Sequence, residues 1–248
     1  MAHFLWTQKQ DIGPEARFGS PMVFDAARGR AVLFGGQGTN LLADTWEWDG
    51  KEWTEMADTG PVARWGHAVA FDSKRQRVVL FGGEDLGDYF GDTWVWDGDE
   101  WTQEQDSGPS SRFINTLAYD AIRDRVVLFG GYNYQSGVFN DTWEYDGTLW
   151  TRVADTGPSS RAAHRIIYDG AKVLLFGGFG GVNFLGDTWE WDGNHWTQLQ
   201  DIGPAPRASF GMAFDTIRKH TILFGGLDKN YANLGDTWEW FDHPLPQS

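Results

Sequence analysis

The sequence predicts an all-β protein built from five copies of one unit. The prediction depends on three observations: a repeat of about 48 residues, many glycines and tryptophans, and no segment with helical periodicity. The 248 residues include 32 glycines and 15 tryptophans, which suits short strands that are joined by tight turns and packed through large aromatic side chains. We therefore expect strands along the whole chain and essentially no helix.

Three motifs carry the repeat and keep the same order in every copy. Because their spacing hardly drifts, no segment remains for a second domain or a long linker, and we expect a single domain over residues 1–248. The motif DxGPxxR begins at Asp11, Asp58, Asp106, Asp155 and Asp201; the Gly-Gly pairs begin at Gly35, Gly82, Gly130, Gly177 and Gly225; and DTW begins at Asp44, Asp92, Asp141, Asp187 and Asp236.

The sequence pattern of each copy predicts four short strands, and the second copy is described as the example. Its second strand is a continuous apolar run, as expected for a strand buried on both faces. Its third strand places Trp94 and Trp96 two residues apart, so both side chains point to one face of the sheet. An Asp-Gly pair follows and is a strong signal for a hairpin into the fourth strand. The four strands are expected at residues 66–72, 77–83, 92–98 and 100–105.

A four-stranded sheet of this size cannot bury two apolar faces alone, but copies stacked around an axis bury them against one another. We therefore predict a five-bladed β-propeller with four antiparallel strands per blade. The fifth copy ends before a fourth strand, and Trp6-Thr7 matches the start of that strand in the other copies. We predict that the N-terminal strand, residues 4–10, completes the last blade and closes the ring. The blades are expected at residues 11–57, 58–105, 106–154, 155–200, and 201–242 together with 4–10.

The repeat resembles that of a known family. The run Val79-Leu80-Phe81-Gly82-Gly83, followed by an aromatic residue in the third strand and a tryptophan in the fourth, is similar to the kelch repeat of bacterial and galactose-oxidase-like type. The resemblance extends over residues 4–242. Kelch propellers commonly have six or seven blades, so five copies imply a narrower channel. The resemblance also implies that the loops before the first strand and between the second and third strands surround the channel mouth, where ligands usually dock.

The candidate binding residues at this mouth are those that differ between copies. The arginine of DxGPxxR and the aspartate of DTW occur in every copy and are interpreted as structural, the arginine as a bridge to a neighbouring blade and the aspartate as a turn cap. Aromatic rings beside polar side chains favour stacking on sugars or capture of a peptide group. The candidate ligand-binding residues are Phe18, Trp65, His67, Tyr89, Phe113, Asn115, Tyr132, Tyr134, His164 and Tyr231.

The opposite face is expected to carry the turns between the first and second strands, which are rich in arginine and lysine. These charges are interpreted as solvated, with docking of an acidic partner as the alternative. They are Arg28, Arg30, Lys74, Arg75, Arg77, Arg123, Arg125, Arg218 and Lys219.

The composition excludes several classes of partner. A formal net charge of −15 repels phosphate backbones and anionic lipid surfaces, so we expect neither nucleic acid nor membrane as a partner. No apolar run approaches the roughly 18 residues that a membrane helix needs. The first residues do not have the pattern of a signal peptide. We therefore expect a cytoplasmic protein if the chain is complete, and otherwise we leave the compartment open. We expect a monomer.

The predicted function is a non-catalytic binding module that presents variable loops to a protein, peptide or glycan ligand. No hydrolase, metalloprotease or phosphate-loop motif occurs, and we assign no catalytic residue, metal or cofactor. One alternative is a lyase or isomerase that uses His67 or His164 as a general base, or that binds a metal through both histidines with Asp85 or Asp88. Copper oxidases of related type need a cysteine, and this chain has none. The other alternative is a structural propeller domain of a larger protein.

Overall fold

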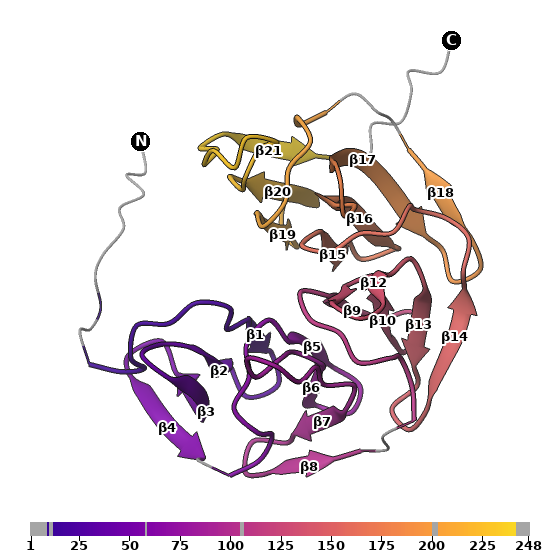
Figure 1. Cartoon of the computed structure of the whole chain (residues 1–248). Helices are drawn as coiled ribbons and strands as arrows, with labels where there is room; N and C mark the ends of the chain where they lie inside the picture. Colours follow the sequence, from indigo (N-terminus) through magenta and orange to yellow (C-terminus); the bar gives the residue numbers. More distant parts are fainter. Residues whose placement is uncertain (1–8, 10–11, 58, 105–106, 200–202, 242–248) are drawn as a thin grey trace.

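The computed structural model describes residues 9, 12–57, 59–104, 107–199 and 203–241. These residues form strands, turns and loops but no helix, so none of them belongs to a helix that could cross a membrane. Five main antiparallel sheets follow one another along the chain around a common centre and form a five-bladed β-propeller (Figure 1). The predicted fold class is thereby confirmed.

The first three blades are four-stranded sheets, and a small two-stranded sheet extends the third. The first contains β1 (Met22–Asp25), β2 (Arg30–Gln37), β3 (Leu41–Trp48) and β4 (Trp53–Ala57). The second contains β5 (Ala68–Asp72), β6 (Arg77–Phe81), β7 (Thr93–Trp96) and β8 (Trp101–Gln103). The third contains β9 (Thr116–Asp120), β10 (Arg125–Phe129), β13 (Thr142–Tyr145) and β14 (Trp150–Ala154), and the small sheet contains β11 (Tyr132–Asn133) and β12 (Gly137–Val138).

The last two blades differ in their number of described strands. The fourth contains β15 (Arg165–Tyr168), β16 (Val173–Phe179), β17 (Phe184–Trp191) and β18 (Trp196–Gln198). The fifth has three strands among the described residues, β19 (Gly211–Asp215), β20 (His220–Phe224) and β21 (Thr237–Trp240). The predicted fourth strand of this blade, residues 4–10, lies outside the described residues except for Lys9, so closure by the N-terminal strand stays a prediction.

Tryptophans join the second, third and fourth blades each to the blade before it. In the second blade, Trp96 is 1% exposed and donates a hydrogen bond of 2.9 Å to Glu47 of the first blade. Trp101 stands opposite Trp96 in the β7–β8 ladder and donates to Thr45 of the first blade at 2.8 Å. A buried indole needs such an acceptor for its N–H. The same bond joins the next blades, from Trp150 to Thr93 and from Trp196 to Thr142, both at 2.8 Å.

The repeated arginine is structural, as interpreted, but its carboxylate partner lies in its own blade and not in a neighbouring one. Arg112 is fully buried and donates to both oxygens of Asp141, at 2.6 and 3.0 Å. It also donates to the carbonyl of Gly130, and its guanidinium lies 3.9 Å from the ring centre of Phe139. This pairing holds the pKa of Asp141 below its ordinary value against the opposing effect of burial. Each blade has the corresponding pair: Arg17–Asp44, Arg64–Asp92, Arg112–Asp141, Arg161–Asp187 and Arg207–Asp236.

A chain of backbone hydrogen bonds runs from blade to blade around the channel. It uses the second residue after each repeated arginine, and all five of these residues have a positive φ. In the second to fifth blades, the N–H of this residue donates to the carbonyl of the equivalent residue one blade earlier. The bonds are Gly66 to Gly19 at 2.8 Å, Ile114 to Gly66 at 2.7 Å, Ala163 to Ile114 at 3.0 Å, and Ser209 to Ala163 at 2.9 Å.

The first and fifth blades are the two ends of this series. Inner strands pack side by side in the order β1, β5, β9, β15 and β19, and Figure 1 shows the ribbons of the first and fifth blades apart. The side chains that face this seam are exposed, with Phe24 at 59% and Phe224 at 56%. The seam is therefore the least buried boundary between blades in the described part of the chain.

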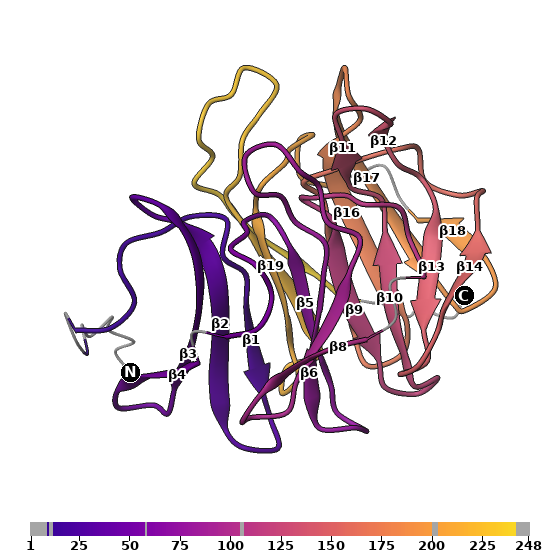
Figure 2. The ribbon, with the colours of Figure 1, turned by 60° about the horizontal axis from the view of Figure 1, so that its bottom comes forward.

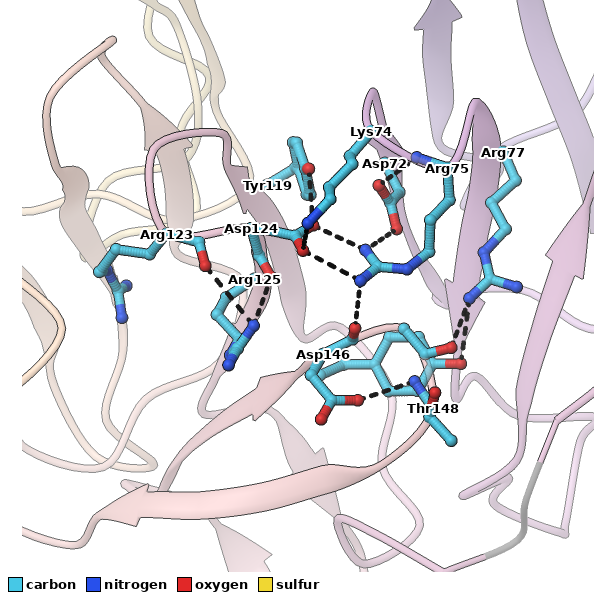
Figure 3. Close-up of polar contacts among 12 residues, drawn as sticks. Asp72, Lys74, Arg75, Arg77, Tyr119, Arg123, Asp124, Arg125, Asp146 and Thr148 are labelled. Atoms are coloured by element: carbon cyan, nitrogen blue, oxygen red, sulfur yellow. Dashed lines mark hydrogen bonds and ion pairs between the residues drawn. The ribbon is translucent and has the colours of Figure 1, made fainter.

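The turns of the opposite face do not form a free basic rim, because carboxylates pair with most of their arginines. Figure 3 shows this pairing around Arg75 and Lys74. Arg75 donates to Asp72 at 2.9 Å and to Asp124 at 2.7 Å, and Lys74 donates to Asp124 at 2.6 Å. These partners hold the pKa of Asp124 well below its ordinary value. The same neutralisation occurs at Arg28, Arg77, Arg123 and Arg218, each within reach of an aspartate or glutamate. The interpretation of these charges as solvated is therefore wrong for Arg75, Arg77 and Arg123, whose side chains are 17–28% exposed, whereas Arg218 is paired but 66% exposed and agrees with it.

Candidate binding site at the channel mouth

Two hollows lie one beside the other where the central channel opens. The larger, of about 490 Å³, is lined by residues that follow the repeated arginines, among them Phe18, Trp65, His67, Asn115 and His164. The smaller, of about 300 Å³, shares His67 and Asn115 and continues along the inner strands. In Figure 2 the loops between second and third strands, including β11–β12, rise on one side of the propeller. The structure thus brings half of the ten predicted residues to one pocket.

Aromatic rings from three blades form a continuous wall beside this pocket, and two of them, Phe18 and Trp65, line it. Phe18 contacts Trp65 edge to face with ring centres 5.6 Å apart, and Trp65 contacts Phe113 in the same way at 5.3 Å. Phe113 in turn contacts Tyr89 at 5.5 Å and Tyr132 at 5.7 Å. Edge-to-face contacts stabilise such a cluster beyond the area it buries. The wall is therefore a fixed surface, because each ring is held by a neighbour.

Two of the predicted residues lie apart from this wall. Tyr134 is 78% exposed at the tip of the β11–β12 hairpin. Tyr231 is 68% exposed and packs on Phe184, between the loops of the fourth and fifth blades. Both could contact only a ligand that extends beyond the channel mouth.

Polar groups without partners lie at the bottom of the pocket. His67 is 4% exposed, and neither of its ring nitrogens has a hydrogen-bond partner among the described residues. Asn115 is 3% exposed, and its side-chain oxygen and nitrogen also lack partners there. Leaving such groups buried and unpaired costs about 1–3 kcal/mol each. His164, at the same position of the fourth blade, is instead paired with the hydroxyl of Thr116 at 3.0 Å.

Both histidines are neutral at physiological pH. Burial lowers the pKa of His67 to about 3, and the positive charge of Arg64 adds to the effect. Burial likewise lowers the pKa of His164 well below its ordinary value. A neutral imidazole offers one donor and one acceptor, so His67 can exchange both kinds of hydrogen bond with a ligand. No three His, Asp or Glu side chains of the described residues gather as metal ligands, which contradicts the metal hypothesis for this pair.

Arg165 lines both hollows but is absent from the candidate residues derived from the sequence. It follows His164 at the start of β15 and is the only charged side chain among the described residues that line the two hollows. Its Nε donates to the carbonyl of Phe210 at 3.1 Å, and no described carboxylate pairs with it. Burial among channel atoms lowers the pKa of the guanidinium, although part of the side chain remains exposed to water. Its position differs in every copy, and that variation was the signal available in the sequence: Pro21, Ala68, Thr116, Arg165 and Gly211.

The fold and the loop-lined mouth define the class of protein: a kelch-type β-propeller. The family described as KLHDC2/KLHL20/DRC7 Kelch-repeats domain matches residues 98–242, and the chain belongs to this family of Kelch repeats. Kelch propeller domains generally mediate protein interactions. No curated protein matches the chain closely enough to name its partner.

Proposed function

We propose that this propeller is a non-catalytic binding module that captures an acidic group of a protein partner at the channel mouth. The observation that carries the proposal is Arg165, whose guanidinium has no carboxylate partner among the described residues and is the only charge that those residues place in the pocket. A carboxylate is the natural complement of a guanidinium, since the two can form parallel charge-assisted hydrogen bonds. His67 and Asn115 add donors and acceptors for the adjoining peptide groups.

The overall charge of the chain restricts which anions can approach. The net charge of −15 repels long polyanions, whereas a single acidic side chain can enter a pocket where Arg165 is the only charged residue in the described lining. The rings of Trp65 and Phe113 are engaged by aromatic neighbours, whereas Phe18 is 61% exposed and can contact a ligand. The positive charge of Arg165 in the same pocket favours a short peptide segment with an acidic residue over a neutral glycan.

The test is selection of random peptides displayed on phage against the full chain. We expect enrichment of sequences with aspartate or glutamate, and weaker binding of those peptides at higher salt. The Arg165→Ala variant should bind them roughly tenfold more weakly or worse, because a charge-assisted hydrogen bond contributes about 1.5–3 kcal/mol.

The matched control is Arg218→Ala. It removes the same charge from an exposed turn of the opposite face, where Arg218 pairs with Asp215 at 2.6 Å. This variant should bind the selected peptides as the parent does. Selection of peptides without acidic residues, or equal binding by the Arg165→Ala variant at an unchanged melting temperature, would contradict the proposal.

A further inference from the structure

Every blade contributes two neighbouring residues to the smaller hollow of the channel, which has a volume of about 300 Å³. All five residues at the fourth position after the repeated arginines line it, and so do all five at the fifth position. The first set is Pro21, Ala68, Thr116, Arg165 and Gly211, and the second set is Met22, Val69, Leu117, Ile166 and Met212. The hollow therefore lies in the centre of the propeller, between the inner strands.

The second set forms an apolar ring, since none of its five side chains carries a charge or an N–H or O–H group. Leu117 and Ile166 are 8% and 4% exposed, but Met22 is 60% exposed. A ligand that covers this ring with hydrocarbon removes apolar surface from water, which is favourable in proportion to the area covered. The apolar ring therefore favours an apolar group in the channel.

Polar groups lie next to the apolar ring, on the side of the channel mouth. Arg165 donates through Nε to the carbonyl of Phe210, and its two NH₂ groups have no hydrogen-bond partner among the described residues. The buried side chains of His67 and Asn115 line the same hollow, and their polar atoms also lack partners there. A guanidinium, an amide and a neutral imidazole can all donate to a carboxylate.

We infer that the channel binds a small free monocarboxylate with an aliphatic tail, such as hexanoate. Its carboxylate accepts hydrogen bonds from Arg165, Asn115 and His67, and its tail covers the apolar ring. At about 30 Å³ for a group of the size of water, the hollow has room for roughly ten non-hydrogen atoms. Hexanoate has about that number.

The position of the apolar ring favours a free acid over a peptide side chain as its occupant. Each inner strand runs away from the mouth, so the apolar ring lies beyond Arg165 for a ligand that enters there. The carboxylate is the last group of an aspartate or glutamate side chain. A peptide whose acidic group reaches Arg165 therefore has no further atoms to cover the ring, whereas the tail of hexanoate can lie on it.

This inference rests on the proposed function in one respect, the use of Arg165 to receive a carboxylate. It goes beyond that function because it adds a ligand that is not a protein. Hexanoate in the channel occupies the place of the partner's acidic side chain, so the two compete. A small amphiphilic acid would thereby regulate capture of the partner.

Isothermal titration calorimetry of the full chain tests the inference with hexanoate and two matched ligands. Hexanoate should bind at least tenfold more tightly than acetate, because each buried CH₂ group strengthens binding roughly fourfold. It should also bind at least tenfold more tightly than hexanamide, which keeps the tail but lacks the charge. No measurable binding of hexanoate, or an affinity equal to that of either matched ligand, would overturn the inference.

Two variants locate the ligand within the channel. Arg165→Ala removes the partner of the carboxylate, and Met22→Asp places a negative charge in the apolar ring at an exposed side chain. Each should weaken hexanoate binding at least tenfold at an unchanged melting temperature. The matched control is Met56→Asp, at an exposed position of the outer strand β4, and it should bind hexanoate as the parent does. Unchanged affinity in either channel variant would overturn the inference, and the comparison of the three ligands needs no variant.

Failure of this inference is distinguishable from failure of the proposed function. Binding of acidic peptides without binding of hexanoate would refute the inference alone. Binding of hexanoate by a chain that selects no acidic peptides would refute the proposed function alone. Where both hold, hexanoate should displace the selected peptides, and simultaneous binding of both ligands would overturn the regulatory part of the inference.

Discussion

The central blades and the fifth blade are built from the same repeat but differ in how deeply they bury it. The phenylalanine before the Gly-Gly pair is 0% exposed in the second and third blades, at Phe81 and Phe129, and 56% exposed at Phe224 of the fifth. The motif around it is unchanged, so the difference comes from the next blade. A central blade has neighbours on both sides, whereas the fifth blade has a described neighbour on one side only.

This difference shows that a kelch-type blade needs a neighbouring blade on each side to bury its apolar faces. Val127, Leu128 and Phe129 are all 0% exposed because the second and fourth blades cover the two faces of the third. The hydrogen bonds that a blade makes within itself, such as the Arg112–Asp141 pair, fix its shape but bury little apolar surface. Most of the hydrophobic stabilisation must therefore come from the boundaries between blades.

The largest expected effect compares one residue position in two blades. Phe129→Ala should lower the free energy of unfolding by about 3–5 kcal/mol, because it removes a fully buried ring that packs on Trp196. Phe224→Ala should cost about 1 kcal/mol or less, because the ring is mostly exposed. Chemical denaturation of both variants gives the comparison. Equal losses would mean that the fifth blade is as well covered in solution as the third.

The buried histidines of the second and fourth blades should make the free energy of unfolding depend on pH. His67 and His164 occupy a position that is Ser20 in the first blade and Phe210 in the fifth. With a pKa lowered to about 3 in the folded protein and near 6.5 when unfolded, His67 binds a proton only on unfolding between these pH values. Its contribution to stability is complete above pH 6.5 and is lost as the pH falls toward 3, by about 1.4 kcal/mol per pH unit.

The measurement is denaturant unfolding at a series of pH values. The His67→Phe variant, which copies the residue of the fifth blade, should lose stability less steeply than the parent between pH 6 and pH 4. The same slope in both proteins would show that His67 is not the titrating group. The comparison of slopes holds even if the variant differs in stability at neutral pH.

A smaller effect distinguishes two outer-strand tryptophans. Trp101→Phe removes the hydrogen bond to Thr45 and leaves that hydroxyl without its donor, so it should cost about 1–2 kcal/mol. Trp53 is the equivalent residue of the first blade, but its N–H has no partner among the described residues. Trp53→Phe should therefore cost less than Trp101→Phe, and the two midpoints in urea provide the test. A larger loss of stability for Trp53→Phe than for Trp101→Phe would indicate that the Trp53 N–H donates a hydrogen bond across the seam in solution.

The residues of the repeat explain why the fold could be predicted and the binding site only in part. Five copies of paired glycines, DTW and DxGPxxR leave little choice of architecture, and Gly83 shows why: its φ is 101° and a Cβ there would lie 3.0 Å from the carbonyl oxygen of Trp65. The residues of the aromatic wall could be chosen as candidates because they vary between copies. Arg165 could not be singled out, because its lack of a described carboxylate partner depends on distances between blades, which cannot be read from the spacing of a repeat.

The ion pairs of the opposite face could not be predicted either, because some of them join two blades. Arg75 comes from the second blade and Asp124 from the third, so their pairing at 2.7 Å depends on how two sheets lie side by side. Sequence spacing within one copy predicts contacts inside a blade far better than contacts across a boundary.

The smallest expected effect concerns the backbone chain around the channel, where the blades differ in residue type at one conformation. Ile114 has a φ of 45°, close to the 64° and 65° of Gly66 and Gly19 at the same position. A β-branched residue is strained in this left-handed region, and glycine is not. Ile114→Gly should therefore raise the free energy of unfolding by up to about 1 kcal/mol, since relief of the strain exceeds the greater flexibility of unfolded glycine. Ala163→Gly, at the same position of the fourth blade, is the matched variant and should gain less, because alanine has no branched side chain to strain. A clear loss of stability in the Ile114→Gly variant would show that packing of the isoleucine side chain outweighs its backbone strain, and the melting temperatures of the two variants decide between these outcomes.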